Sequence, residues 1–428
     1  MAEGSPVKGE RPWGQEDLLR RLAGAVAGRR LPQSLLVHGP EGVGKRSLAL
    51  WIARALQCEA VETAETAEAP CEACRNCRMA ARLEHPDIHV HFPMPRPKRA
   101  ASRAKLREAI EAQRHERLAL LREDLHARLD PDAVTGLYVA AVENIRDQAS
   151  RRPSMARKSV FVIEDAERMV PQSASPEAAN AFLKLLEEPP PFAYIVLTSG
   201  RPDALLPTIR SRTVPLRIAP LPTERVAAYV AEHLGVRDAD RARGVARRAG
   251  GAVYRARALA HSEGGESGAG ESGAAADGLL AAALDGTPRA RYRAASRFSA
   301  RGARGELEPA LEALRIRLRD MLCVAAGAAD AALDPDRMKD RIKDRKKGSK
   351  GSGGAGSPGA PGAGGGPAEG AVLEALGAVD AAMEGVGRNL NPQATTALLL
   401  EEMSAAFAGR STGRTAGTPQ FAGVLRSL

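Results

Sequence analysis

A glycine-rich turn between a strand-like run and a helical run constrains the fold of this chain more than any other feature. The strand-like run is Leu35-Leu36-Val37-His38, and the turn reads Gly39-Pro40-Glu41-Gly42-Val43-Gly44-Lys45-Arg46. Such turns place backbone N–H groups around phosphates, and the Lys binds the β- and γ-phosphates. The pattern predicts a phosphate loop whose nucleotide-binding residues are Gly39, Gly42, Gly44 and Lys45.

The residue after Lys45 departs from this pattern. A Ser or Thr hydroxyl normally follows the Lys and holds Mg²⁺, whereas this chain has Arg46 there and Ser47 one residue later. One residue along a helix turns a side chain by roughly 100°. We therefore expect a nucleotide site in which Mg²⁺-dependent hydrolysis is doubtful.

A second departure lies at the end of another apolar run, Val160-Phe161-Val162-Ile163. In a working site an Asp at this strand end helps to hold Mg²⁺, and a neighbouring Glu aligns water. This chain has Glu164 followed by Asp165, the reverse order. We include both acids in the nucleotide site and expect reduced or lost turnover.

Strand-like and helical runs alternate up to about residue 220, and the pattern is helical thereafter. Further strand-like runs are Ile88 to Phe92, Tyr194 to Thr198 and Val214 to Leu216, with a helix at Pro176 to Glu188. Alternation of this kind predicts an α/β fold with a mainly parallel sheet and helices on both faces. A small helical lid and a C-terminal all-α domain should follow.

Composition suggests the domain boundaries. We expect an α/β domain over 1–220 with a charged insertion at 95–136, a lid over 221–262 and a helical domain over 278–428. The stretch 263–277 is rich in Gly, Ser and Glu, and 348–370 consists almost wholly of Gly, Ser, Ala and Pro, which favours a flexible linker and a flexible loop. The insertion reads as one or two solvated helices.

Four of the five cysteines cluster in one short window, at Cys58, Cys71, Cys74 and Cys77. Four thiolates at this spacing favour a closed, structural Zn²⁺ site. An iron–sulfur cluster remains an alternative with four thiolates. The fifth, Cys323, lies in an apolar helical run and is predicted to pack as a small hydrophobic residue.

The net charge of +10 and the pI near 9.6 favour polyanionic partners such as DNA. A generally Arg-rich composition would explain the same numbers. No apolar run approaches the ~20 residues that span a bilayer, and the first residues are polar. We expect a cytoplasmic protein without membrane contact.

These motifs together resemble the bacterial clamp-loader ATPase family of the DNA polymerase III holoenzyme, with AAA+ modules and a collar domain. The resemblance rests on the phosphate loop, on the cysteine knuckle before the second strand and on several further segments. These are Trp13-Gly14-Gln15, Leu31 to Ser34, Asn180 to Pro190, Leu206 to Thr213 and Asn389-Leu390-Asn391-Pro392-Gln393. The last resembles the family's signature in the oligomerising collar.

The resemblance implies roles for three further residues. In Ser211-Arg212-Thr213 the family has Ser-Arg-Cys, whose arginine reaches a neighbour's ATP; Arg212 is thus the expected trans arginine finger. Thr198 matches the first sensor position, and Arg255 in the lid loosely matches the second.

The family contains ATP-hydrolysing gamma/tau subunits and a delta-prime subunit that is often not an ATPase. Arg46 and the Glu164-Asp165 order favour the delta-prime type, with structural Zn²⁺ and a weak or inactive ATP/Mg²⁺ site. Its expected partners are gamma/tau and delta subunits in a ring, the sliding clamp and primed DNA. The alternatives are a gamma/tau-like ATPase or a stand-alone zinc-containing nucleic-acid-binding protein.

Overall fold

A computed structural model of the chain falls into two units, residues 1–129 with 133–258 and residues 259–428 with 130–132. Each unit is considered separately. The residues that the structure describes are 11–63, 69–97, 102–125, 127, 135–169, 177–262, 269–285, 287–299, 303–328, 332, 368–387 and 390–410.

The first unit is built on a five-stranded sheet in the order β2-β5-β6-β1-β7. All of its pairs are parallel, as the alternation of strands and helices predicts. Parallel order brings the carboxyl ends of β1 and β5 to one edge, where the phosphate loop and the acids follow. The strands are β1 (Ser34–His38), β2 (Ile88–His91), β5 (Ser159–Ile163), β6 (Ala193–Ser199) and β7 (Val214–Arg217).

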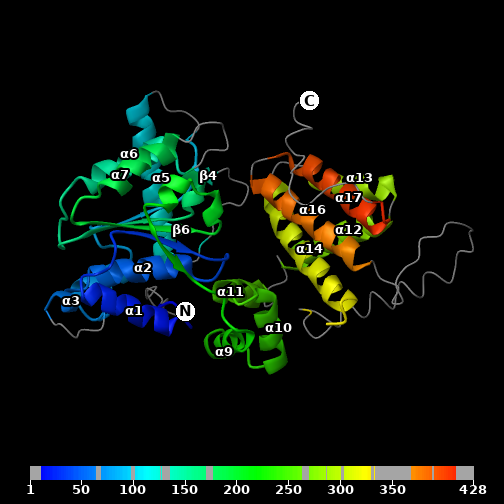
Figure 1. Cartoon of the computed structure of the whole chain (residues 1–428), viewed down its shortest axis with the longest axis horizontal. Coiled ribbons are helices and arrows are strands. Elements are labelled where there is room, and N and C mark those ends of the chain that lie inside the picture. Colours follow the sequence, from blue (N-terminus) through cyan, green and yellow to red (C-terminus); the bar gives the residue numbers. More distant parts are fainter. Residues whose placement is uncertain are drawn as a thin grey trace, which may run out of the picture. The chain divides into compact units, whose positions relative to one another are not determined.

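Helices cover both faces of this sheet, and alternate side chains of each strand explain why. In β5, Val160 and Val162 join one apolar core with α1 (Glu16–Ala27) and α2 (Lys45–Leu56). Phe161 and Ile163 join the opposite core with α6 (Val139–Ala149) and α7 (Glu177–Glu187). Figure 1 shows these two helix pairs on opposite sides of the strands. The predicted α/β fold is confirmed.

The strand β7 lies at one edge of the sheet and pairs with β1. Its second residue is Pro215, which has no backbone N–H, and Val214 is 47% exposed. Proline within a strand is found mainly at sheet edges. The shorter elements of this unit are α3 (Glu59–Thr63), α4 (Arg75–Ala81), β3 (Met94–Pro95), β4 (Thr135–Gly136), the 3₁₀ turns η1 (Ala166–Met169) and η2 (Pro202–Ala204), and α8 (Pro207–Arg210).

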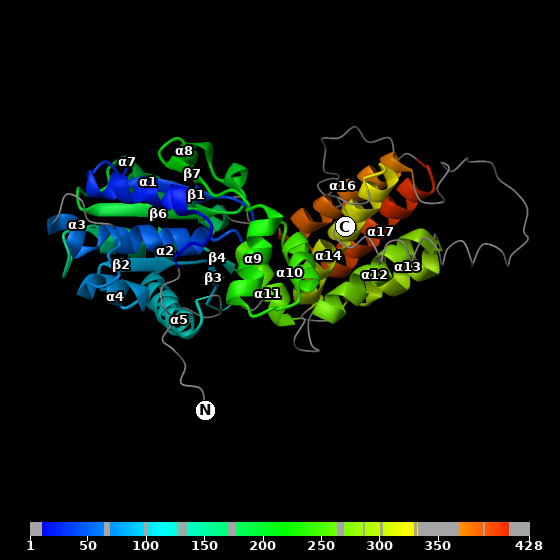
Figure 2. The same ribbon diagram turned by 90° about the horizontal axis from the view of Figure 1, so that it is seen from below.

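The charged insertion forms one long helix, α5 (Arg103–Glu123), which packs against α6 and β3. The expectation of solvated helices is only partly right. Ile110, Leu118 and Leu121 are buried, and so are the side chains of Arg114 and Arg117. Figure 2 shows α5 alongside the rest of the first unit. The insertion is therefore a packed part of this unit.

Three helices complete the lid: α9 (Thr223–His233), α10 (Ala239–Ala249) and α11 (Val253–Ser262). An aromatic cluster joins α9 to the start of the described chain. The ring of Trp13 lies 5.2 Å from that of Tyr229, which stacks on His233, and the Arg225 guanidinium lies 5.1 Å from the Trp13 ring. The lid thus packs on the residues that precede α1.

Among the described residues of the second unit, the regular elements are all helices. The unit comprises α12 (Ala269–Asp285), α13 (Pro288–Ser296), α14 (Ala303–Ala325), α16 (Glu369–Gly387) and α17 (Pro392–Phe407) around one apolar core. The predicted linker over 263–277 was wrong in its second half, because α12 begins at Ala269 and buries Ala275 and Ala276. Residues 348–367 of the predicted Gly-rich loop and Asn389 lie outside the described residues.

The collar-like segment begins a helix. Asn391 caps α17 by accepting a hydrogen bond from the Ala394 N–H at 3.1 Å, and Pro392 occupies the first turn. None of the described helices is both long and apolar enough to cross a membrane.

Candidate nucleotide site and metal centre

The phosphate loop joins β1 to α2 and is shaped by its glycines. Gly42 and Gly44 have φ values of +77° and +104°, a region that side chains other than glycine rarely adopt. Gly44 is the residue before α2, so the N–H groups at this end of the helix face the loop. The predicted glycines therefore form a cradle suited to an anion.

The lid lies directly against this loop. The Tyr254 N–H donates to the Gly42 carbonyl at 3.0 Å, and the Tyr254 ring would lie 2.8 Å from a Cβ placed on Gly44. The main chain and Cβ of Arg255 would lie 3.1 Å from a Cβ on Gly42. The structure thus places Arg255 beside the loop, where the sequence predicts it.

Lys45 folds back onto the loop. Its ammonium group donates to the Gly39 carbonyl at 3.0 Å and to the Pro40 carbonyl at 2.9 Å. Burial lowers the pKa of Lys45, while the charges of Asp165 and Glu167 oppose that shift. The amine therefore lies within the phosphate loop, on carbonyls that a bound phosphate would compete with.

Arg46 occupies the place of the missing hydroxyl and forms a two-point ion pair across the sheet edge. Its Nε and Nη2 atoms donate to the two carboxylate oxygens of Glu164, each at 2.6 Å. Its Nη1 donates to the carbonyl of Leu125, just beyond α5, at 2.9 Å. Burial would lower the pKa of Arg46, but the charge and hydrogen bonds of Glu164 raise it.

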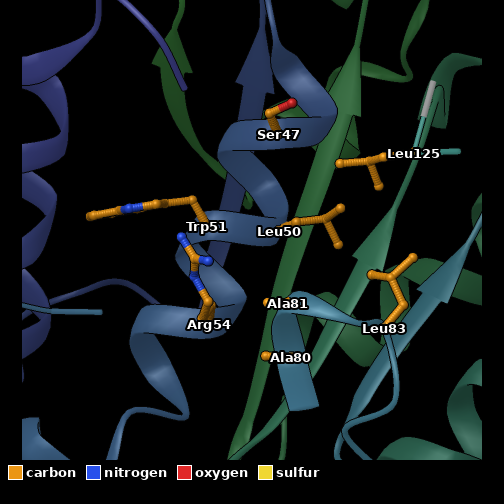
Figure 3. A pocket seen from close by; sticks show the side chains of 8 residues that line it. All are labelled: Ser47, Leu50, Trp51, Arg54, Ala80, Ala81, Leu83 and Leu125. Carbon is orange, nitrogen blue, oxygen red and sulfur yellow. The ribbon is translucent and has the colours of Figure 1, made fainter. Parts of the chain in front are cut away.

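Ser47 does not replace the missing hydroxyl. Its side chain is buried on α2 and lines a small cavity with residues of α4 and with Leu125, as Figure 3 shows. This placement agrees with the shift of about 100° expected for one helical residue. The other residues around that cavity are Leu50, Trp51, Arg54, Ala80, Ala81 and Leu83.

The remaining acids after β5 are arranged by backbone contacts. The Asp165 N–H donates to the Thr198 hydroxyl at 3.1 Å, which connects a predicted acid with the predicted sensor at the end of β6. Glu167 accepts from the Gly200 N–H at 3.0 Å, and its second carboxylate oxygen is buried with no hydrogen bond to any described residue. Glu167 thus also lies at this site, although the sequence pattern did not single it out; it follows Glu164 by three residues.

A Mg²⁺ ion does not fit this arrangement. A divalent cation here would use the Glu164 carboxylate and a hydroxyl after the lysine, but both carboxylate oxygens bind Arg46 and the hydroxyl is absent. A guanidinium is a permanent cation that repels a second positive charge. Glu164, predicted as part of the nucleotide site, thus has both carboxylate oxygens bound to Arg46.

The four clustered cysteines come together as the spacing predicts. Their sulfur atoms all lie within 4.8 Å of one another, and Cys71 Sγ lies 4.0 Å from Cys77 Sγ. A tetrahedral Zn²⁺ with bonds of ~2.3 Å separates its sulfurs by about 3.8 Å. The donor set Cys58, Cys71, Cys74 and Cys77 therefore fits a metal such as zinc.

Backbone amides support these sulfurs. The N–H groups of Cys71, Cys74 and Cys77 donate to the sulfurs of Cys58, Cys71 and Cys74, at 3.3, 3.4 and 3.3 Å. The hydrogen bond with Cys77 lowers the pKa of Cys58 to about 4, whereas the same contact raises that of Cys77. Such N–H···S bonds stabilise thiolate ligands.

The knuckle is fastened to the sheet through the end of α2. The Gln57 side chain donates to the main-chain carbonyls of Asp87 and Lys158. The Gln57 main-chain carbonyl accepts a hydrogen bond from the Asn76 side chain at 3.0 Å. Arg54 pairs with Glu72 at 3.2 Å. These contacts fix α4, which carries Cys77, against the helix that follows the phosphate loop.

Arg212 lies on the surface of the first unit, two residues beyond α8. It is 35% exposed, pairs with Glu187 at 2.7 Å and donates to the Thr208 carbonyl at 3.0 Å. A residue that reaches a neighbouring subunit must lie at the surface, and Arg212 does so. Its role in trans remains a prediction.

The fold and this site define a class: an AAA+-type phosphate-loop module with a cysteine knuckle. Residues 14–222 match the family described as "DNA polymerase III, delta subunit". Over these residues, about half of its length, the chain is similar to clamp-loader subunits of DNA polymerase III.

Individual relatives include both types of subunit. The chain is 29% identical to the "DNA polymerase III subunit gamma/tau" of Mycobacterium tuberculosis over 52% of its own length and 31% of that protein. It is 28% identical to the "DNA polymerase III subunit delta'" of Pseudomonas aeruginosa over 49% of each. A solved gamma-subunit-related protein of Thermotoga maritima aligns over 92% of this chain and 99% of its own, at 14% identity and a TM-score of 0.35. The chain spans only a third to a half of these curated relatives.

Proposed function

We propose that this chain is a delta-prime-type clamp-loader subunit, a structural and regulatory AAA+ component that helps to load the sliding clamp onto primed DNA. The observation that carries the proposal is the ion pair between Arg46 and Glu164. It replaces the metal-binding groups of the site while the cradle and the fold are retained. We therefore expect this module to hydrolyse little ATP itself and to act on the ATPase sites of neighbouring subunits.

Arg212 supplies the proposed contribution to a neighbour. An arginine that reaches the γ-phosphate of another subunit's ATP stabilises charge in the transition state and typically accelerates hydrolysis ~10³-fold or more. Its surface position supports this role, and its present partners, Glu187 and the Thr208 carbonyl, are exchangeable contacts. The proposed partners are gamma/tau and delta subunits, the clamp and primed DNA, with structural Zn²⁺ at the knuckle.

The test is ATP turnover by the purified chain alone and then with gamma/tau and delta subunits, clamp and primed DNA. We expect no turnover alone, and assembly-dependent turnover that falls at least about tenfold with Arg212→Ala. The matched control is Arg210→Ala, because Arg210 lies on the same segment and pairs with the surface residue Asp203.

A second candidate is a gamma/tau-like ATPase, which the similarity to gamma/tau subunits favours. Robust turnover by the chain alone, abolished by Lys45→Ala, would establish it and overturn the delta-prime proposal. Equal turnover of the assembly with wild type and Arg212→Ala would remove the arginine finger.

A further inference from the structure

We propose that Arg46 is a built-in cation that takes the place of the divalent metal, so that the phosphate loop binds nucleoside polyphosphates without Mg²⁺. This inference concerns the same nucleotide site as the proposed function, and it rests on that function only in assuming that the phosphate loop binds nucleotide. It concerns which ionic form of nucleotide this site accepts.

The first argument is that the cradle retains its donors. Within the described residues, the backbone N–H groups of Gly42, Val43 and Gly44 make no hydrogen bond to the protein. Lys45 lies at the base of the loop, and its ammonium group donates hydrogen bonds to two carbonyls of the same loop. Convergent N–H groups at a helix N-terminus beside an ammonium group suit a phosphate anion.

The second argument is the geometry of the guanidinium. Arginine has five N–H donors, of which three are used, two on Glu164 and one on the Leu125 carbonyl. The Arg46 side chain is 30% exposed, whereas that of Glu164 is only 4% exposed. Arg46 therefore neutralises Glu164 on its buried side and keeps donors for a ligand on its open side.

The third argument is that the cation is held rigidly from two directions. Glu164 follows β5, whereas Leu125 follows the insertion helix α5. The bidentate pair fixes the plane of the guanidinium, and the charge of Asp124, beside Leu125, also favours the charged form of Arg46. Held in this way, Arg46 keeps N–H donors at the position after Lys45 without a metal, and it occupies the carboxylate oxygens that Mg²⁺ would need.

The experiment is equilibrium binding of ATP and of ADP to the full chain by isothermal titration calorimetry, in excess EDTA and then in excess Mg²⁺. For the wild type we expect dissociation constants that agree within about twofold between the two buffers. For Arg46→Thr, which restores the hydroxyl and frees Glu164, we expect binding at least about tenfold tighter in Mg²⁺ than in EDTA.

Two outcomes would overturn the proposal: wild-type binding that requires Mg²⁺, or absence of ATP and ADP binding in both buffers. Lys45→Ala should abolish binding in either buffer, whereas Arg210→Ala should leave both constants unchanged. The wild-type comparison decides the matter even if Arg46→Thr fails to fold. The two tests are independent. Mg²⁺-dependent nucleotide binding would not change the expected effect of Arg212→Ala on the assembly, and the absence of that effect would not change these dissociation constants.

Discussion

The phosphate loop and the cysteine knuckle lie at opposite ends of one helix, α2, and they are built from different groups: backbone amides in the loop and side-chain thiols in the knuckle. The loop at its start has the backbone shape of a phosphate loop, with Arg46 at the position where a metal-binding hydroxyl normally lies. The knuckle begins at Cys58, two residues past its end, and retains all four thiol groups within 4.8 Å. A cradle made of backbone groups tolerates a change of chemistry, whereas a metal centre made of side chains depends on each of them.

The largest effect should come from removing one knuckle ligand. We expect Cys74→Ser to lower bound zinc from about one equivalent to well below it and to destabilise the first unit, because structural Zn²⁺ contributes directly to folding. Metal analysis of the purified chain and thermal unfolding measure both effects. The control is Cys323→Ser in the second unit, which should retain the metal; equal zinc in both variants would show that the four thiols do not hold it.

The next effect should come from breaking the ion pair in the nucleotide site. Among the described residues, the Glu164 carboxylate, which is 4% exposed, forms hydrogen bonds only with Arg46. Arg46→Met leaves this buried charge uncompensated, which costs about 3 kcal/mol of unfolding free energy. The double variant Arg46→Met/Glu164→Gln has no buried charge at this site. It should therefore recover part of the unfolding free energy that Arg46→Met loses. Urea denaturation measures the four-member cycle, and additive effects would mean that the pair is not coupled.

The smallest of these effects should come from the shape of the loop. Gly44→Ala places a Cβ at φ +104°, 2.8 Å from the Tyr254 ring, which should cost about 2 kcal/mol. Urea denaturation should show this loss, with Gly244→Ala as the control, because a Cβ there meets no atom within 4 Å and improves helix propensity. If both substitutions stabilise the chain, the loop does not require glycine at position 44.

Much of the first unit could be predicted from sequence because its signals are local. Apolar runs fixed the strands, and the cysteine spacing alone brought four sulfur atoms together. The partners of Arg46 could not be predicted in this way, since Glu164 and Leu125 are 118 and 79 residues distant. The sequence identified a missing hydroxyl but not the contact that replaced it.

Composition gave the wrong prediction for two segments, part of the Gly-rich linker and the charged insertion. Residues 269–277 were predicted as part of a linker because the stretch is rich in Gly, Ser and Glu. They lie in α12 instead, where Ala275 and Ala276 are buried together with Leu279 and Leu280, four residues further along. The insertion looked solvated because it is charged, yet Arg114 donates to the Val90 carbonyl and Glu111 beside it. Long arginine side chains can cover a core with their methylene groups and still satisfy their charge.

The proline in the edge strand β7 has a consequence for self-association. An open sheet edge is a template on which a strand from another molecule can assemble, and proline is one of the residues that prevent such growth. Pro215 interrupts the row of N–H donors along β7, and Arg217 adds a charge two residues later. This edge is thus protected against aggregation through added strands, and a subunit docked nearby must be recognised by side chains rather than by continuing the sheet.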